Sequence, residues 1–388
     1  MAPATTALHA EHVALGATMT TFAGWSMPLR YTSDLAEHAA VRERAGLFDL
    51  SHMGQIEVSG PGAAAALDRA LVTVSSTLPV GRARYSLLTD ADGGILDDLI
   101  VYRLAEAEFL IVANAANRLR VLDEVTGRAT ADGARAGVHV ADRTEARALI
   151  ALQGPAAPGV LAALTDADVP ALRYYRVTTA TVAGTPVLLA RTGYTGEVGY
   201  ELSVPASSAV GLWRALLEAG RAAGVQPCGL AARDTLRLEA GMPLYGHELT
   251  TATTPYDVGL GRLVDLDHDF VGRDALARRA EEPARTALVG LAGTGRRAAR
   301  AGAILHDGDA QVGTVTSGVL SPTLAHPVAL AHVDPAAAAV GTVLAADVRG
   351  TRQPMTVVDL PFYRRPARPP APSDRQPSPA AAPPEENR

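Results

Sequence analysis

The pattern of apolar residues changes near residue 285, and this change constrains the fold more than any other feature of the chain. Before that point, segments typical of strands alternate irregularly with segments typical of helices. From Thr286 onward the sequence consists of short strands and turns, at 287–291, 312–316, 328–333, 342–348 and 355–358. This predicts a small all-β domain at 285–365, preceded by an α+β region at 1–284.

Both ends of the chain differ from this folded pattern. Residues 366–388 include eight prolines and no large aliphatic or aromatic side chain. Such a segment cannot bury enough surface to offset the entropy of ordering, so we expect a disordered tail. Residues 1–15 lack the basic stretch and apolar core of a secretory signal. With no run of about 18 apolar residues, we expect no membrane association and a cytoplasmic protein.

Composition excludes several classes of chemistry. All 35 basic residues are arginine, because the sequence contains no lysine. This rules out a Schiff-base lysine, and therefore pyridoxal phosphate (PLP) catalysis, and it rules out a P-loop lysine. The single cysteine, Cys228, permits no intramolecular disulfide and is expected to be a buried packing residue. Scattered histidines without ligand spacing predict no metal site, and a net charge of −6 argues against nucleic acid.

Two adjacent aspartates, Asp97 and Asp98, follow a DADGG turn at 90–94 and begin a strand over 95–103. Neighbouring residues on a strand point to opposite faces. We therefore expect that the two carboxylates share no site, and that one faces a pocket while the other is solvated or caps the turn. On these residues alone, turn chemistry for both is the simpler alternative.

A glycine-rich hairpin is predicted at 191–204. In its second strand Tyr200 and Leu202 share the apolar face, so Glu201 points the other way, to solvent or into a polar pocket. Tyr194 lies in the loop, where its ring could stack on a flat ligand. On the hairpin alone, we expect a solvent-facing glutamate rather than a binding residue.

A predicted helix within 226–249 carries Arg233 and Arg237 four residues apart. Side chains with this spacing share one face of a helix, and either guanidinium could hold a carboxylate through two hydrogen bonds. The alternative is a pair of surface arginines with Asp234 and Glu239 as partners.

Seven segments of the chain together carry a family resemblance. They are FAGWSMPLRY (22–31), GLFDLSHMGQIEVSG (46–60), YSLLTDADGGILDDLIVYR (85–103), RTGYTGEVGYEL (191–202), PCGLAARDTLRLEAGMPLYGHEL (227–249), DFVGRDAL (269–276) and TSGVLSP (316–322). Each motif alone is modest, but seven in one order, over roughly residues 8–365, are highly specific. The chain resembles the aminomethyltransferase (T-protein) family of the glycine cleavage system.

The resemblance implies a fold and an activity. The fold is α+β, a three-domain cloverleaf around a central folate site with a C-terminal β-barrel-like domain. The activity is transfer of a one-carbon unit from the aminomethyl-dihydrolipoyl arm of the lipoylated H-protein to tetrahydrofolate. Ammonia is released and 5,10-methylenetetrahydrofolate is formed, with tetrahydrofolate as co-substrate, no metal and no covalent enzyme intermediate.

The resemblance also implies roles for individual residues. Asp98 lies beside the reactive nitrogens of tetrahydrofolate and is the candidate catalytic residue, while Asp97 faces the other way. Glu201 binds the edge of the pterin, and Arg233 is a further folate contact. Arg364 reaches the folate or the partner protein. Further positions matching the family's pocket are Tyr85, Asn114 and Tyr194.

One departure from the family pattern and two alternative functions accompany this hypothesis. Arg262 stands where many members have a tryptophan that stacks on folate, and its planar guanidinium could stack in the same way. A stand-alone folate-dependent demethylase of a small methylated amine or sulfonium remains an alternative. A non-catalytic folate-binding protein of iron–sulfur maintenance is disfavoured, because the only cysteine, Cys228, lies outside that group's K-G-C-Y motif.

Overall fold

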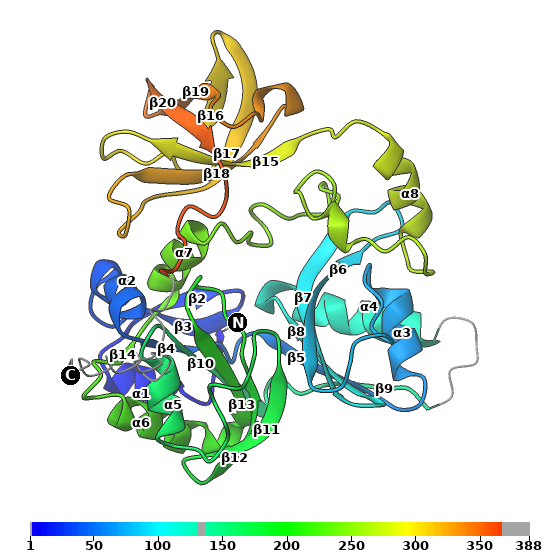
Figure 1. Ribbon diagram of the computed structural model, residues 1–388, viewed down its shortest axis with the longest axis vertical. Helices are drawn as coiled ribbons and strands as arrows, with labels where there is room; N and C mark the ends of the chain where they lie inside the picture. Colours follow the sequence, from blue (N-terminus) through cyan, green and yellow to red (C-terminus); the bar gives the residue numbers. More distant parts are fainter. Residues whose placement is uncertain (1, 131–136, 367–388) are drawn as a thin grey trace, which may run out of the picture.

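Three lobes surround a common centre in the computed structural model, which describes residues 2–130 and 137–366 (Figure 1). Two lobes mix helices with sheets, and the third is a closed barrel. The predicted α+β fold with a C-terminal barrel is therefore confirmed. Apart from Pro366, the tail predicted to be disordered lies outside the described residues.

The first lobe is a five-stranded sheet in the order β6-β7-β8-β5-β9, covered on one face by two helices (Figure 1). Alternation along β5 directs Ile56 and Val58 inward, where they pack with Leu67 and Val121 of the helices in a fully buried core. The elements are β5 (Gly54–Ser59), α3 (Ala63–Ala70), β6 (Arg82–Thr89), β7 (Ile95–Ala105), β8 (Glu108–Ala113), α4 (Arg118–Thr130) and β9 (His139–Asp142).

The second lobe is a six-stranded sheet in the order β11-β12-β13-β10-β4-β14. Because β4 precedes the first lobe in sequence, the chain starts this sheet, builds the first lobe and then returns. Leu202 of β13 and Trp213 of α6 belong to its buried core. The elements are β4 (Gly46–Asp49), β10 (Arg147–Gln153), α5 (Ala157–Ala162), β11 (Val177–Val182), β12 (Thr185–Ala190), β13 (Gly199–Pro205), α6 (Ala209–Ala219) and β14 (Gln226–Pro227).

An N-terminal segment and one later helix pack against this second lobe. A small sheet has the order β1-β3-β2, and α2 packs against α7. Helix α7 also contacts strands of the barrel, so it lies between two lobes (Figure 1). The elements are β1 (Ala4–Thr5), α1 (His9–Ala14), β2 (Thr18–Phe22), β3 (Trp25–Arg30), α2 (Asp34–Glu43) and α7 (Leu230–Glu239).

The third lobe is a barrel closed in the order β15-β18-β17-β16-β19-β20, which leaves no open sheet edge. Its interior is apolar and buried, and α8 (Arg273–Glu281) precedes it in sequence. Among the described residues, no helix is long and apolar enough to cross a membrane. The strands are β15 (Ala287–Gly293), β16 (Ile304–Asp307), β17 (Ala310–Leu320), β18 (Pro327–Val333), β19 (Val343–Val348) and β20 (Thr351–Val358).

Candidate functional site

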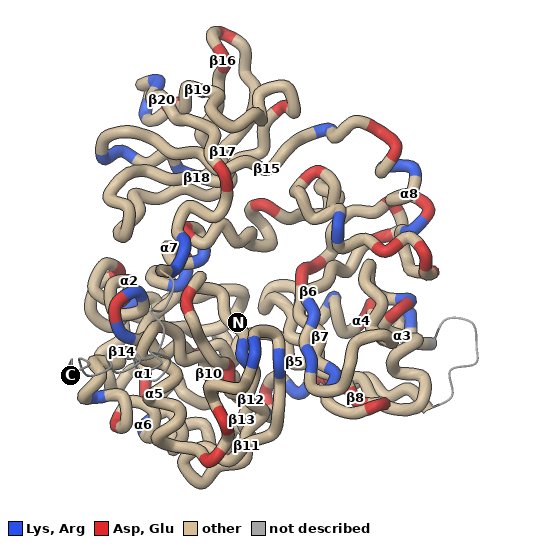
Figure 2. The backbone as a smooth tube through the Cα atoms, in the orientation of Figure 1, with Lys and Arg blue, Asp and Glu red and all other residues tan. Residues whose placement is uncertain are grey.

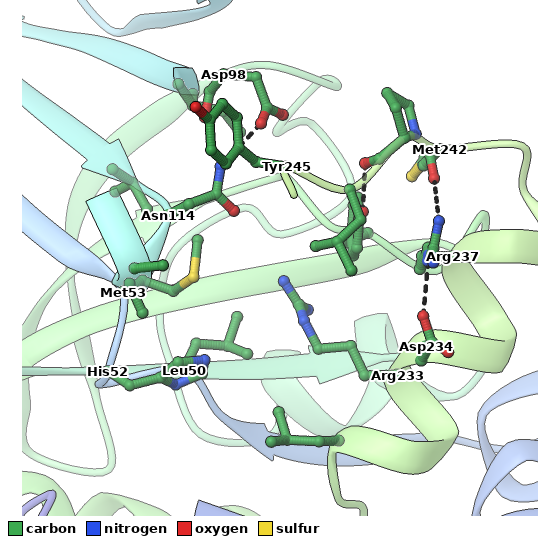
Figure 3. Close-up of a pocket in the computed structure, with 18 of the residues that line it drawn as sticks. Leu50, His52, Met53, Asp98, Asn114, Arg233, Asp234, Arg237, Met242 and Tyr245 are labelled. Atoms are coloured by element: carbon green, nitrogen blue, oxygen red, sulfur yellow. Dashed lines mark hydrogen bonds and ion pairs between the residues drawn. The ribbon is translucent and has the colours of Figure 1, made fainter. Parts of the chain in front are cut away.

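A cavity of about 630 Å³ lies between the two α+β lobes, and we call it the central cavity. Its walls come from the β2–β3 hairpin, the β6–β8 sheet, β13, α7 and the loop after α7 (Figure 3). Most of the wall is apolar, and a small number of polar side chains converge on it, which is the usual character of a small-molecule site. The predicted site residues that line it are Tyr85, Asp98, Asn114, Tyr194, Glu201 and Arg233.

The turn before β7 fixes where Asp98 lies. The carboxylate of Asp90 accepts the backbone N–H groups of Asp92 (2.9 Å) and Gly94 (2.8 Å), which closes the DADGG reversal. A Cβ at Gly94 would lie 2.3 Å from the carbonyl oxygen of Thr251, so only glycine fits this close approach. The turn therefore locks the start of β7 against the loop that follows α7.

Two neutral donors hold the Asp98 carboxylate at the cavity wall. The hydroxyl of Tyr85 donates to Oδ2 (3.0 Å), and Nδ2 of Asn114 donates to Oδ1 (2.8 Å). Burial raises the pKa of Asp98 to about 6, although both hydrogen bonds act in the opposite direction. Near neutral pH this is an ionised carboxylate close to its titration range, as a general base requires.

The prediction that Asp97 and Asp98 share no site is wrong in one respect. Asp98 lines the cavity and Asp97 does not, as alternation along the strand requires. However, Nδ2 of Asn114 donates to Oδ1 of both carboxylates, at 3.0 Å and 2.8 Å. Asp97 is fully buried rather than solvated, and it also accepts Nδ2 of Asn117 (2.6 Å). Burial and the Asp98 charge raise the pKa of Asp97, so the two carboxyls titrate together.

Glu201 also lines the cavity and is buried, so the expectation of a solvent-facing glutamate is wrong. Oε2 accepts the hydroxyls of Thr192 (2.5 Å) and Tyr102 (3.4 Å). Within the described chain, Oε1 receives no hydrogen bond, so one carboxylate oxygen stays available to a ligand. A buried acceptor of this kind needs a donor from whatever fills the cavity.

The two arginines of α7 have different partners. Arg233 lies with its guanidinium 4.8 Å from the centre of the Tyr194 ring and extends into the cavity (Figure 3). Arg237 is fully buried and pairs with Glu248 (3.0 Å) and Asp234 (2.8 Å). The alternative of two surface arginines is therefore wrong. Arg233 is the one that extends into the cavity, and Arg237 fixes the loop after α7.

Two residues discussed from the sequence lie away from the cavity wall. Arg364 is exposed, and its Nη2 donates to the carbonyl of Leu360 (3.3 Å), so the structure does not bring it to the other site residues. Arg262 is also exposed, and the cavity-lining residue of its segment is Leu260. Stacking of Arg262 on a cavity ligand would therefore need a different side-chain position.

The sequence reasoning missed His52, which lines the cavity beside Leu50 and Met53 (Figure 3). The side chain is 2% exposed, and Nδ1 has no partner among the described residues. Burial lowers the pKa of His52 to about 4, so the imidazole is neutral at physiological pH. The available signal was its position inside the DLSHMG segment.

Across the described ranges, no group of three or more His, Cys, Asp or Glu side chains could hold a metal ion.

Two domain families match this chain, and they correspond to the two parts of its architecture: the two α+β lobes around the central cavity, and the barrel that follows them. The GCVT N-terminal domain matches residues 8–268, and the glycine cleavage T-protein C-terminal barrel domain matches residues 287–364. Together they span almost the whole folded part of the chain.

Individual relatives agree with these matches. An aminomethyltransferase of Streptomyces coelicolor is 58% identical over 93% of this chain and 97% of its own length. One from Cutibacterium acnes is 55% identical over 93% of this chain and 98% of its own. The crystal structure of the glycine cleavage system aminomethyltransferase T from Bartonella henselae superposes with a TM-score of 0.86, at 38% identity over 93% and 98% of the two chains. The chain belongs to the glycine cleavage T-protein family.

Proposed function

We propose that this chain is the aminomethyltransferase of a glycine cleavage system, with tetrahydrofolate as co-substrate and a lipoylated H-protein as donor. The observation that carries the proposal is the half-buried Asp98 carboxylate, fixed by Tyr85 and Asn114 on the wall of a cavity large enough for a reduced pterin. Relatives named aminomethyltransferase support this function over the demethylase and iron–sulfur alternatives.

One group in the cavity suits a pterin ring. The adjacent N–H donors of a pterin can bind a carboxylate as a pair, and Oε1 of Glu201 is an acceptor without a partner among the described residues. A flat ligand with polar edge atoms would pair with this oxygen, whereas a purely apolar ligand would leave it without a donor.

Asp98 is the group that assists the chemistry in this proposal. The transferred carbon forms bonds to two folate nitrogens, while its bonds to the amino nitrogen and to the lipoyl sulfur break. The two protons lost from the folate nitrogens leave on ammonia and on the thiol. A carboxylate beside the attacking nitrogen can accept its proton and stabilise positive charge that develops on the carbon. Fixation of both substrates in one cavity supplies further acceleration.

The direct test of the proposed function is ammonia release from aminomethylated H-protein, measured with and without tetrahydrofolate in a coupled assay. We expect release that depends strongly on tetrahydrofolate, with methylenetetrahydrofolate formed in equal amount. Sarcosine and dimethylglycine serve as comparison substrates. Turnover of these amines, with none of H-protein, would show that the demethylase alternative is correct.

The binding roles give a second prediction. Glu201→Ala and Arg233→Ala are each expected to weaken tetrahydrofolate binding by roughly 10–100-fold, because each removes a charged hydrogen-bonding group. Isothermal titration calorimetry measures the dissociation constants. Glu108→Ala, which changes an exposed glutamate at the start of β8, is the matched control and should leave the affinity unchanged. Unchanged affinity in both cavity variants would mean that the folate site is elsewhere.

A further inference from the structure

The segment that follows β8 is built around the fully buried carboxyl of Asp97. Asn114 is the first residue after β8, and η1 (Ala115–Asn117), one turn of 3₁₀ helix, continues the chain into α4. Oδ1 of Asp97 accepts Nδ2 of Asn114 (3.0 Å) and Nδ2 of Asn117 (2.6 Å). Its Oδ2 accepts the backbone N–H of Asn114 (3.1 Å). One side chain therefore fixes both ends of this short segment.

The same segment forms part of the wall of the central cavity. Asn114, Ala115 and Ala116 line the cavity, whereas Asp97 and Asn117 do not. Asp97 thus lies behind the wall, where it contacts the groups that form it but is out of reach of a cavity ligand. Any influence of Asp97 on the reaction must pass through the residues that it holds.

Asp97 helps to determine which way the amide of Asn114 points. Three oxygens surround Nδ2 of Asn114: Oδ1 of Asp97 (3.0 Å), the backbone carbonyl oxygen of Asp98 (2.9 Å) and Oδ1 of Asp98 (2.8 Å). Figure 3 shows the nitrogen of Asn114 toward Asp98 and its oxygen away from it. A flipped amide would set its oxygen against these three acceptors, and the Asp98 carboxylate would lose one of its two side-chain donors.

A second buried carboxyl, that of Glu37, has a similar set of contacts but no link to the site. Charged positions of both signs are spread over all three lobes (Figure 2), yet neither Glu37 nor Asp97 forms an ion pair within the described residues. Glu37 accepts the backbone N–H groups of Tyr31 (2.6 Å), Thr32 (2.8 Å) and Gly229 (2.8 Å). Two of the three donors to Asp97 are instead side-chain amides, and one of these also donates to the proposed catalytic carboxylate.

We propose that Asp97 is a positioning residue for the reaction, which holds the amide of Asn114 in the orientation that fixes the Asp98 carboxylate at the cavity. This inference rests on the proposed function, because it assumes that Asp98 assists the chemistry. Asn117 is the remote end of the same chain of hydrogen bonds, since it donates to Asp97 and does not line the cavity. Small displacements of a reacting group lower rates strongly, so both residues should affect turnover without touching a substrate.

The test measures kcat and both KM values in the coupled assay, and the dissociation constant of tetrahydrofolate by calorimetry. Asp97→Ala is expected to lower kcat about 10–100-fold, while the dissociation constant changes by less than about threefold. Asp97→Asn should recover part of the loss, to within about tenfold of the wild type, because its oxygen can accept both amides. Asn117→Ala, which leaves every cavity residue unchanged, should lower kcat by about 3–10-fold.

Glu37→Gln is the matched control, because it also changes a fully buried carboxyl that accepts three N–H groups. It should lower the melting temperature and leave the kcat of the folded enzyme unchanged. Melting temperatures of all variants show whether folding is retained. If Asp97→Ala does not fold, Asp97→Asn and Asn117→Ala decide the question, because both keep most of the hydrogen bonds of the segment.

Three outcomes would overturn the inference. A kcat within about twofold of the wild type in Asp97→Ala and Asn117→Ala would show that Asp97 does not position Asp98. A weakened affinity for tetrahydrofolate with unchanged kcat would assign Asp97 to the binding wall alone. An equal loss of kcat in Glu37→Gln would mean that turnover responds to any change in a buried carboxyl. Failure of the wild type to release ammonia from H-protein would instead contradict the proposed function itself, and this inference with it.

Discussion

Asp98→Asn is expected to lower turnover with aminomethylated H-protein by about 10²–10⁴-fold while tetrahydrofolate binding is retained. The amide keeps the size and shape of the side chain, and its oxygen can still accept from Asn114. It cannot accept a proton from an attacking nitrogen, and proton transfer by a positioned base contributes rate factors of this order. Single-turnover measurements at saturating folate separate the loss of chemistry from a change in binding.

The pH dependence of turnover gives an independent measure of the same role. Burial raises the pKa of Asp98 to about 6, and the reaction requires the ionised form. Activity of the wild type should therefore rise with pH through about 6 and be lost below it. The apparent pKa of this activity loss belongs to the Asp97–Asp98 pair, because the two carboxyls share Asn114 and titrate together. The residual activity of Asp98→Asn should no longer fall as the pH is lowered through about 6.

Stability distinguishes a chemical role from a structural one. A carboxyl whose pKa is raised in the folded state binds more protons than in the unfolded chain, so ionisation of Asp98 at neutral pH lowers stability. Asp98→Asn should consequently be no less stable than the wild type at pH 7.5, as judged by its melting temperature. Asp92→Asn, an exposed neighbour in the same turn, is the control for activity. Near-wild-type turnover of Asp98→Asn would refute the assignment.

Local sequence patterns predicted the elements that position the site. Alternation along 200–204 placed Glu201 opposite the apolar face, and the structure buries Tyr200 and Leu202 in the core of the second lobe. The DADGG turn and the strand after it also formed as the residues indicated. Helix α4 was not predicted, and neither was the short barrel strand β16 at 304–307, which carries one fully buried apolar side chain, Leu305.

Contacts between distant segments could not be predicted in this way. Asn114 bridges Asp97 and Asp98 because β8 pairs with β7 in a register that strand patterns leave open. His52 faces the cavity because the turn after β4 lies between two lobes, and its own segment shows only a histidine between Ser51 and Met53. The role of Arg364 came from the family resemblance, and its exposed position leaves that role a prediction.

Glu239→Ala is expected to destabilise the protein by about 3–5 kcal/mol at pH 7, because it leaves buried partners without their anion. Glu239 ends α7, and its fully buried carboxylate accepts Arg42 Nη2 (2.9 Å) and the backbone N–H of Thr323 (3.0 Å). His38 Nε2 lies 3.2 Å away. These contacts join α7, which carries Arg233, to α2 and to the loop between β17 and β18. Urea unfolding followed by circular dichroism measures the loss.

The pH dependence identifies the source of this stability. Burial alone would raise the pKa of Glu239, but the hydrogen bond and charge of His38, together with Ser321 and Arg42, lower it to about 2 from 4.5. A lowered carboxyl pKa contributes stability above 4.5 that is lost as pH falls toward 2. The deficit of Glu239→Ala should therefore shrink between pH 5 and pH 3. Glu218→Ala, which breaks an exposed pair with Arg221, should cost at most about 1 kcal/mol. If both variants lost equally little stability, the buried network would not be what holds α7 against the barrel.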